Sequence, residues 1–155
     1  MFKTILAVAV AVAAPTLALA APPQQVAPET IKAIEAVAYD YVDGQLEGDP
    51  ARVARALHPD LAKRMVKTVD RDETLPLRRM SKDELVSLTA DGALKTPKDK
   101  WDRQVRVVEV DANIAMARVE TPWFIDYFHL GRFGDRWVIV NALWHMKPRQ
   151  AAPAN

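Results

Sequence analysis

The chain of 155 residues contains no cysteine and only three histidines. Without cysteine the protein forms no disulfide, carries no thiolate nucleophile and has no cysteine metal site. The histidines lack the paired spacing of a metal site, so we expect no bound metal. A glycine-rich phosphate loop and a nucleophile elbow are also missing, so we expect neither a nucleotide cofactor nor serine-hydrolase chemistry, and no other cofactor.

The sequence also lacks an excess of charge of either sign. The sequence has 21 Lys plus Arg against 20 Asp plus Glu, a formal net charge of +1. Basic residues between Arg52 and Lys82 are interleaved with acidic ones, which indicates a solvated mixed surface. Nucleic acid is therefore not an expected partner.

No apolar run reaches the ~20 residues that a membrane-spanning helix needs. Lys3 is followed by an apolar run that stops at Pro15, and Ala18-Leu19-Ala20 supplies the small residues of a cleavage site. This pattern predicts a signal peptide over residues 1–20, rather than a retained membrane anchor. We expect the mature protein to begin at Ala21, to have no membrane span after cleavage, and to be periplasmic or secreted.

The rest of the chain has the size of one domain. Prolines between residues 21 and 28, and a tail over 148–155, offer little apolar surface to balance the entropy of ordering. We therefore expect a single domain over residues 29–147, with a flexible segment before it and a disordered tail after it.

Helical spacing dominates the first half of that domain. Ile31, Ile34 and Ala38 recur at helical intervals from Glu29 onward, and Gly48 suits the left-handed position that ends a helix. Asp49-Pro50 then fits the cap and first residue of a second helix.

The second helix is predicted to continue past a proline. Val53 and Leu57 are four residues apart, and Leu61 and Met65 extend the same spacing. Pro59 disfavours the helical conformation at the residue before it, so we expect a bend there followed by more helix.

A short strand is expected within residues 75–80, followed by a third helix. Ser81 and Glu84 have the spacing of a capping box, and Gly92 suits the end of this helix. Period-two patterns then predict strands over 101–110 and 114–119, and a hairpin over 122–145 with a type II′ turn at Gly134-Asp135. The order predicts an α+β fold with helices packed on one face of a curved antiparallel sheet.

A regular hairpin pairs Phe133 with Arg136, and counting outward places Asp126 diagonal to both Asn141 and His145. A carboxylate beside an imidazole is what a general base near neutral pH requires. Asp126 and His145 are therefore candidate catalytic residues, although the three polar groups could equally well satisfy one another structurally. The walls of the predicted pocket on this face are Phe124, Phe128, Leu130, Ile139, Asn141 and Leu143.

The opposite face of the hairpin is apolar and needs a cover, for which we expect a second copy of the chain. We therefore predict a homodimer through this outer face, with His129 as an interface or surface histidine rather than a catalytic one. The residues of this face are Trp123, Ile125, Tyr127, His129, Val138, Val140, Ala142, Trp144 and Met146.

Tyr41 of the first helix is a further candidate ligand-binding residue. Its hydroxyl could enter the pocket as an oxyanion donor, or the ring could pack in the core with one hydrogen bond at its tip.

Several segments together carry a family resemblance that covers about residues 29–146. The chain resembles the nuclear transport factor 2-like superfamily in its SnoaL-like group, and within it the family labelled "putative lumazine-binding". The resemblance implies a cone-shaped fold whose concave face forms a pocket used for binding, isomerisation, dehydration or cyclisation. The segments are Tyr41-Val-Asp-Gly44, Gly48-Asp49, Ala56-Leu-His-Pro-Asp60, Lys63-Arg64, Asp126-Tyr-Phe-His-Leu130 and Arg136-Trp-Val-Ile-Val-Asn-Ala-Leu-Trp144.

Function is not decided by this fold. We expect an exported small-molecule-binding protein of unspecified ligand. One alternative is a cofactor-free isomerase or dehydratase that uses Asp126 and His145 as acid and base, with Tyr41 or Asn141 as electrophile. Another is an interaction module whose cone is filled by side chains.

Overall fold

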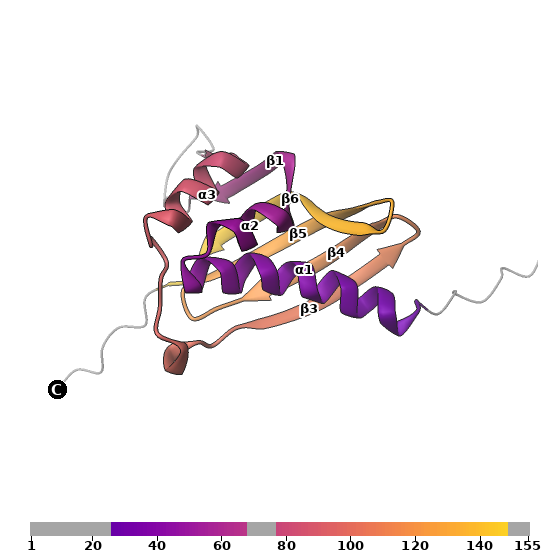
Figure 1. Ribbon diagram of the computed structural model, residues 1–155, viewed down its shortest axis with the longest axis horizontal. Helices are drawn as coiled ribbons and strands as arrows, with labels where there is room; N and C mark the ends of the chain where they lie inside the picture. The colour runs from indigo at the N-terminus through magenta and orange to yellow at the C-terminus, as the bar shows by residue number, and fades with distance from the viewer. Residues whose placement is uncertain (1–25, 68–76, 149–155) are drawn as a thin grey trace, which may run out of the picture.

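The computed structural model describes residues 26–67 and 77–148. The predicted signal peptide and the tail from residue 149 lie outside these residues. Figure 1 shows α1 lying along one face of a curved sheet, with α2 and α3 near β1. The helices are α1 (Pro28–Glu47), α2 (Pro50–Ala56), α3 (Lys82–Ala90) and the 3-10 helix η1 (Lys98–Lys100), and the strands are β1 (Leu57–Val66), β2 (Leu77–Met80), β3 (Gln104–Asp111), β4 (Ile114–Glu120), β5 (Phe124–Phe133) and β6 (Arg136–Met146).

The six strands form one sheet in the order β2-β1-β6-β5-β4-β3. Strands β3 to β6 are an antiparallel meander, whereas β1 lies parallel to β6. The predicted α+β class is confirmed, but the sheet is mixed rather than wholly antiparallel. The parallel pair brings the first strand in the sequence beside the last, so residues from both ends of the domain meet.

Local sequence signals at the helix ends behave as predicted. Gly48 ends α1 in the left-handed conformation, with φ of 75°. Asp49 accepts a hydrogen bond from the backbone N–H of Arg52 at 3.0 Å and so caps α2. Ser81 caps α3 in the same way, accepting from the N–H of Glu84 at 3.2 Å.

The predicted continuation of the second helix is wrong, because the chain from Leu57 to Val66 is strand β1. A spacing of four residues fits a strand, whose period is two, as well as a helix. Pairing with β6 decides between them, since Leu57 lies opposite Ile139 and the ladder resumes at Ala62. Pro59, which cannot donate to a ladder, falls in the interruption between these two points.

The hairpin has the predicted turn but not the predicted register. Gly134 has φ of 61°, and among the described residues Ala112 is the only non-glycine with positive φ, so Asp135 fits a type II′ turn. Leu130 pairs with Ile139 as expected, but His129 pairs with Asn141, which leaves Val140 as a β-bulge. Beyond the bulge the predicted pairings are wrong, and the observed ones are Phe128 with Ala142, Asp126 with Trp144 and Phe124 with Met146.

This one-residue insertion exchanges the two faces of β6 beyond the bulge. Trp144 and Ala142 face α1 together with Asp126, whereas His145, opposite Ile125, points to the outer face. The inner face and α1 form the hydrophobic core, whose largest fully buried side chains include Tyr41, Phe128, Ile34, Leu46, Leu130 and Ile139.

Candidate functional site

A cavity of about 510 Å³ lies between the inner face of the sheet, α1, and the segment that runs from α3 toward η1. This size falls within the range of small-molecule pockets. Most of its walls are apolar or aromatic. Its lining residues are Tyr41 and Gln45 of α1, Lys63 of β1, Arg78 and Met80 of β2, Leu85, Leu88 and Thr89 of α3, Ala93, Leu94, Lys95 and Thr96 after it, and Trp123, Phe124, Asp126, Trp144 and Met146.

A buried ion pair forms the inner end of the cavity. The Nζ atom of Lys63 lies 2.7 Å from Oδ1 and 2.6 Å from Oδ2 of Asp126. It also donates to the hydroxyl oxygen of Tyr41 at 2.9 Å. All three residues are at least 97% buried. An ammonium has three N–H donors, so these contacts use the full hydrogen-bonding capacity of Lys63.

The geometry of this pair favours its charged form, although burial opposes the charge on each partner. Burial opposes the charge on Lys63, but the Asp126 carboxylate and the Tyr41 oxygen outweigh it, so the pKa of Lys63 is raised. Burial raises the pKa of Asp126 above its ordinary value, although the Lys63 ammonium acts to lower it. Because both carboxyl oxygens accept from the same ammonium, the geometry fits an ionised carboxylate. Burial also raises the pKa of Tyr41, which keeps its hydroxyl protonated.

Two polar atoms beside the ion pair have no hydrogen-bond partner among the described residues: Oε1 of Gln45 and Nε1 of Trp144. The amide nitrogen of Gln45 is engaged, since it donates to the hydroxyl of Tyr41 at 3.2 Å. Buried polar atoms are rarely left unpaired, because each costs about 1–3 kcal/mol. Both atoms are fully enclosed by their neighbours, so neither is presented to the cavity.

The side chains of Tyr41, Gln45, Lys63, Asp126 and Trp144 form one polar cluster, and aromatic rings hold it in place. Phe128 packs edge-on against the Tyr41 ring at a centroid distance of 5.3 Å, and Phe124 packs likewise against Trp144 at 6.0 Å. The Lys63 ammonium lies 4.9 Å from the centroid of the Trp144 ring. These contacts restrict the rotation of each polar side chain and favour a preformed site.

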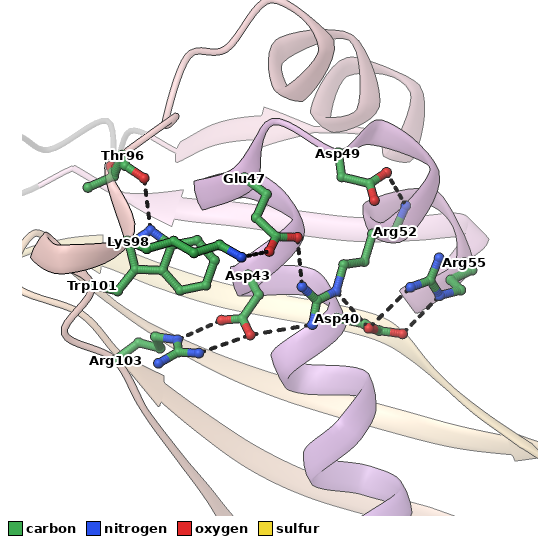
Figure 2. Close-up of polar contacts among 10 residues, drawn as sticks. All are labelled: Asp40, Asp43, Glu47, Asp49, Arg52, Arg55, Thr96, Lys98, Trp101 and Arg103. Carbon is green, nitrogen blue, oxygen red and sulfur yellow. Dashed lines mark hydrogen bonds and ion pairs between the residues drawn. The ribbon is translucent and has the colours of Figure 1, made fainter.

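A network of charged residues fixes α1 on its opposite side (Figure 2). Arg52 contacts Asp40 at 2.8 Å, Glu47 at 2.9 Å and Asp43 at 3.4 Å. Arg103, from the segment before β3, donates to both oxygens of Asp43 at 2.6 and 3.0 Å. By joining α1 to α2 and to the chain before β3, the network positions the helix turn that carries the site residues.

Some of the predicted site residues meet as expected. Asp126 and Phe124 line the cavity from β5, and Tyr41 approaches from α1. Three further predicted wall residues lie on the same face but are buried in the core and do not line the cavity: Phe128, Leu130 and Ile139.

The predicted contact between Asp126 and His145 is wrong, because the bulge at Val140 puts them on opposite faces of the sheet. The His145 ring instead lies 3.1 Å from the carbonyl oxygen of Met146 through Nδ1. Leu143 is 51% exposed on that outer face. Asn141 lines a second hollow of about 570 Å³, together with His129 and other residues from β3 to β6.

Sequence reasoning missed Lys63, Gln45 and Trp144. Lys63 was hidden because residues 57–66 were interpreted as a helix, in which it shares no face with Leu61 and Met65. As a strand, the same residues alternate, and a lysine between two inward apolar positions would have indicated a buried partner. Trp144 was assigned to the outer face by the regular register.

Within residues 26–67 and 77–148, no group of three or more His, Cys, Asp or Glu side chains could hold a metal ion. The same residues contain no helix of the length and hydropathy needed to cross a bilayer.

The family model described as "Putative lumazine-binding" matches residues 29–145, which is most of the chain. The chain belongs to this family. The sequence resemblance is thereby confirmed, and the matched range contains every residue of the polar cluster. Curated protein sequences yield no significant match.

Solved structures support the same fold for this family member. A nuclear transport factor 2-like protein of unknown function from Shewanella baltica is 19% identical with a TM-score of 0.67, covering 81% of this chain and 99% of that one. One from Silicibacter pomeroyi is 21% identical with a TM-score of 0.63, covering 77% and 97%. A ketosteroid isomerase-like protein from Erwinia carotovora atroseptica is 18% identical with a TM-score of 0.52, covering 78% and 99%. At these identities the likeness establishes a nuclear transport factor 2-like fold.

Proposed function

We propose that this protein binds a small organic molecule in the cavity closed by α1, α3 and the sheet. The observation that carries the proposal is a largely apolar cavity of about 510 Å³ that is lined by aromatic side chains and ends at the ion pair of Lys63 and Asp126. The family description, which names a small organic ligand, supports it.

Binding without turnover is favoured by the state of the ion pair. Both oxygens of Asp126 are held by Lys63 at 2.6 and 2.7 Å, so neither oxygen is free to take a proton from a substrate. His145, which would have completed an acid-base pair, lies on the other face of the sheet. A second candidate is a cofactor-free isomerase. It is supported by the presence of Asp126 and Tyr41 in the cavity wall and by the structural similarity to a ketosteroid isomerase-like protein. That candidate requires Lys63 to release Asp126 when substrate binds.

Export is part of the proposal. It rests on the positive charge at Lys3, the apolar run and Ala18-Leu19-Ala20, which together have the form of a secretory signal. N-terminal sequencing of the soluble protein from a secreting host should return Ala21 as the first residue, and an intact Met1 would contradict export.

A cavity-blocking variant tests the binding function. Ala93 is exposed and lines the cavity, so Ala93→Trp should fill its entrance without disturbing the core. Ala36 is also exposed, on α1, but does not line the cavity, which makes Ala36→Trp the control. Each protein is purified under native conditions and any retained small molecule is identified by mass spectrometry.

We expect the wild type and Ala36→Trp to retain the same compound and Ala93→Trp to lose it. In parallel, the neutral probe 2-naphthamide is titrated and followed by NMR of the tryptophan indole N–H signals. Binding should move the signals of Trp123 and Trp144, which line the cavity, but not that of Trp137. If no compound is retained and the probe moves neither signal, the function is wrong. Chemical conversion of the retained compound by fresh protein would favour the isomerase.

A further inference from the structure

We propose that the ligand of this cavity is a neutral, apolar molecule and not a polar heterocycle of the lumazine kind. This ligand class rests on the proposed function and concerns the same cavity. It is supported by the polar groups of the cavity wall, most of which are already paired within the protein.

The charges at the inner end of the cavity cancel each other. The side chains of Lys63 and Asp126 lie 2.6 Å apart and both residues are buried. The N–H donors of Lys63 are used by Asp126 and by the hydroxyl oxygen of Tyr41. An ionic ligand group beside this pair would lose its hydration without gaining a counter-charge. The inner end therefore favours a ligand without net charge.

The other buried polar side chains of the wall are also withdrawn from the cavity. The hydroxyl of Thr89 donates to the carbonyl oxygen of Leu85 at 2.8 Å. The amide nitrogen of Gln45 donates to Tyr41 at 3.2 Å, while its Oε1 and the Nε1 of Trp144 have almost no accessible surface. A ligand that enters the cavity thus meets few hydrogen-bond partners among the buried side chains that the structure describes.

The segment after α3 closes the wall with hydrogen bonds of its own. The backbone N–H of Ala93 donates to the carbonyl oxygen of Leu88 at 3.0 Å. The N–H of Thr96 donates to the carbonyl oxygen of Leu46 at 2.9 Å. The hydroxyl of Thr96 donates to the carbonyl oxygen of Leu94 at 2.8 Å. These donors are therefore unavailable to a ligand.

Most of the remaining wall is apolar. Trp123, Phe124 and Trp144 line the cavity from the sheet, and Leu85 and Leu88 line it from α3. An apolar molecule gains free energy in proportion to the area that it buries against such a wall. Lumazine, which the family description names, is a bicyclic heterocycle edged by carbonyl oxygens, ring nitrogens and N–H groups. Many of these groups would lose water without finding a partner, which disfavours this ligand.

Three bicyclic probes of similar outline test the ligand class: naphthalene, quinoxaline and lumazine. Each is titrated into the wild type at slightly acidic pH, at which all three are neutral, and followed by NMR of the indole N–H signals. We expect naphthalene to bind most tightly and lumazine least tightly. Each step toward the more polar probe should weaken binding about 5-fold or more, which is the range for one polar group left unpaired.

A variant that supplies a free amide tests the cause of this order. Leu94 is 38% exposed and lines the cavity, so Leu94→Asn adds a donor and an acceptor to the wall without disturbing the core. It should reduce the preference for naphthalene over lumazine about 5-fold. Leu77 is 50% exposed and does not line the cavity, so Leu77→Asn is the control and should leave the preference unchanged.

The compound retained through native purification gives an independent measurement. A neutral, apolar molecule should pass into hexane equally well from an acidic and from an alkaline extract of the protein. A compound that stays in water, or that changes phase with pH, would overturn the proposed ligand class.

The remaining outcomes separate the ligand class from the proposed function. If lumazine binds as tightly as naphthalene, the ligand class is wrong while the binding function stands. If no compound is retained and none of the three probes moves the Trp123 or Trp144 signal, the binding function itself fails. If Leu94→Asn and Leu77→Asn change the preference equally, the preference does not arise in this wall and its assignment to the cavity is overturned.

Discussion

The ammonium of Lys63 on β1 reaches the carboxylate of Asp126 on β5 across the intervening strand β6, at 2.6 Å. The two residues are 63 positions apart in the sequence. Lys63 lies beside Ala142 of β6, whose small side chain leaves room for the lysine stem above the sheet. The pair thus ties the first strand of the domain to the hairpin at its end.

Breaking this pair from either side should destabilise the fold. Lys63→Met leaves the Asp126 carboxylate buried and unpaired, and Asp126→Asn leaves the Lys63 ammonium buried and unpaired. Each variant should lower the free energy of unfolding by about 3–5 kcal/mol. Urea unfolding of the variants at neutral pH measures these costs.

The double variant Lys63→Met with Asp126→Leu provides the control. Because it leaves no unpaired charge, it should cost less than the sum of the two single variants. If the cost of the double variant equals the sum of the two single costs, the residues act independently. In Lys63→Met alone, burial without a counter-ion favours protonated Asp126, so the deficit should shrink as the pH is lowered toward 5.

Alkaline pH should unfold the protein through the same cluster. The pKa values of Lys63 and Tyr41 are raised, so the folded state holds protons that the unfolded chain releases above about pH 10. The contribution of both groups is fully present below that pH and is lost as the pH rises through their folded values. The ionisation of Tyr41 is measured as the difference in phenolate absorbance between the wild type and Tyr41→Phe. This difference should appear only at the pH at which circular dichroism shows that the protein unfolds. Tyr41 phenolate in a folded protein would contradict the buried assignment.

The network on the outer side of α1 should contribute unequally to stability. Asp43, with a side chain 9% exposed, accepts from both Arg103 and Arg52, and Asp43→Asn should cost about 2–3 kcal/mol. Asp40 is 29% exposed, and Asp40→Asn should cost about 1 kcal/mol or less. In 1 M salt the Asp40 effect should vanish while most of the Asp43 effect persists. Urea unfolding at low salt and in 1 M salt measures both effects. If salt reduces the two effects equally, the ion pairs of Asp43 are as exposed to solvent as those of Asp40.

We propose that the outer face of the sheet forms a homodimer, through residues that differ from those the regular register predicts. Trp144, Ala142 and Met146 lie on the inner side, whereas Tyr127 and Leu143 are about half exposed on the outer side. Leu143→Glu should therefore convert a dimer to a folded monomer in sedimentation experiments at micromolar concentration, because each interface would bury two charges. Leu94→Glu, an exposed position at the cavity, should leave the dimer intact. A monomeric wild type would contradict the proposal.

The sequence by itself determined the features that depend on a few adjacent residues. Gly48 with Asp49 separates two helices, Ser81 starts the third, and Gly134 supplies the positive φ that the hairpin turn needs. Each of these follows from local sterics or from a single side-chain to backbone hydrogen bond, so the α+β order and the positions of most elements were predictable.

Only the tertiary structure decided which polar groups meet. Leu57, Leu61 and Met65 fit a helix and a strand equally well by spacing, and pairing with β6 made them a strand, which turned Lys63 inward. The bulge at Val140 then placed Trp144 beside Asp126 and His145 on the far face. A period of two makes every side-chain direction beyond Val140 depend on a single inserted residue, and that insertion is seen only in the pairing of β5 with β6.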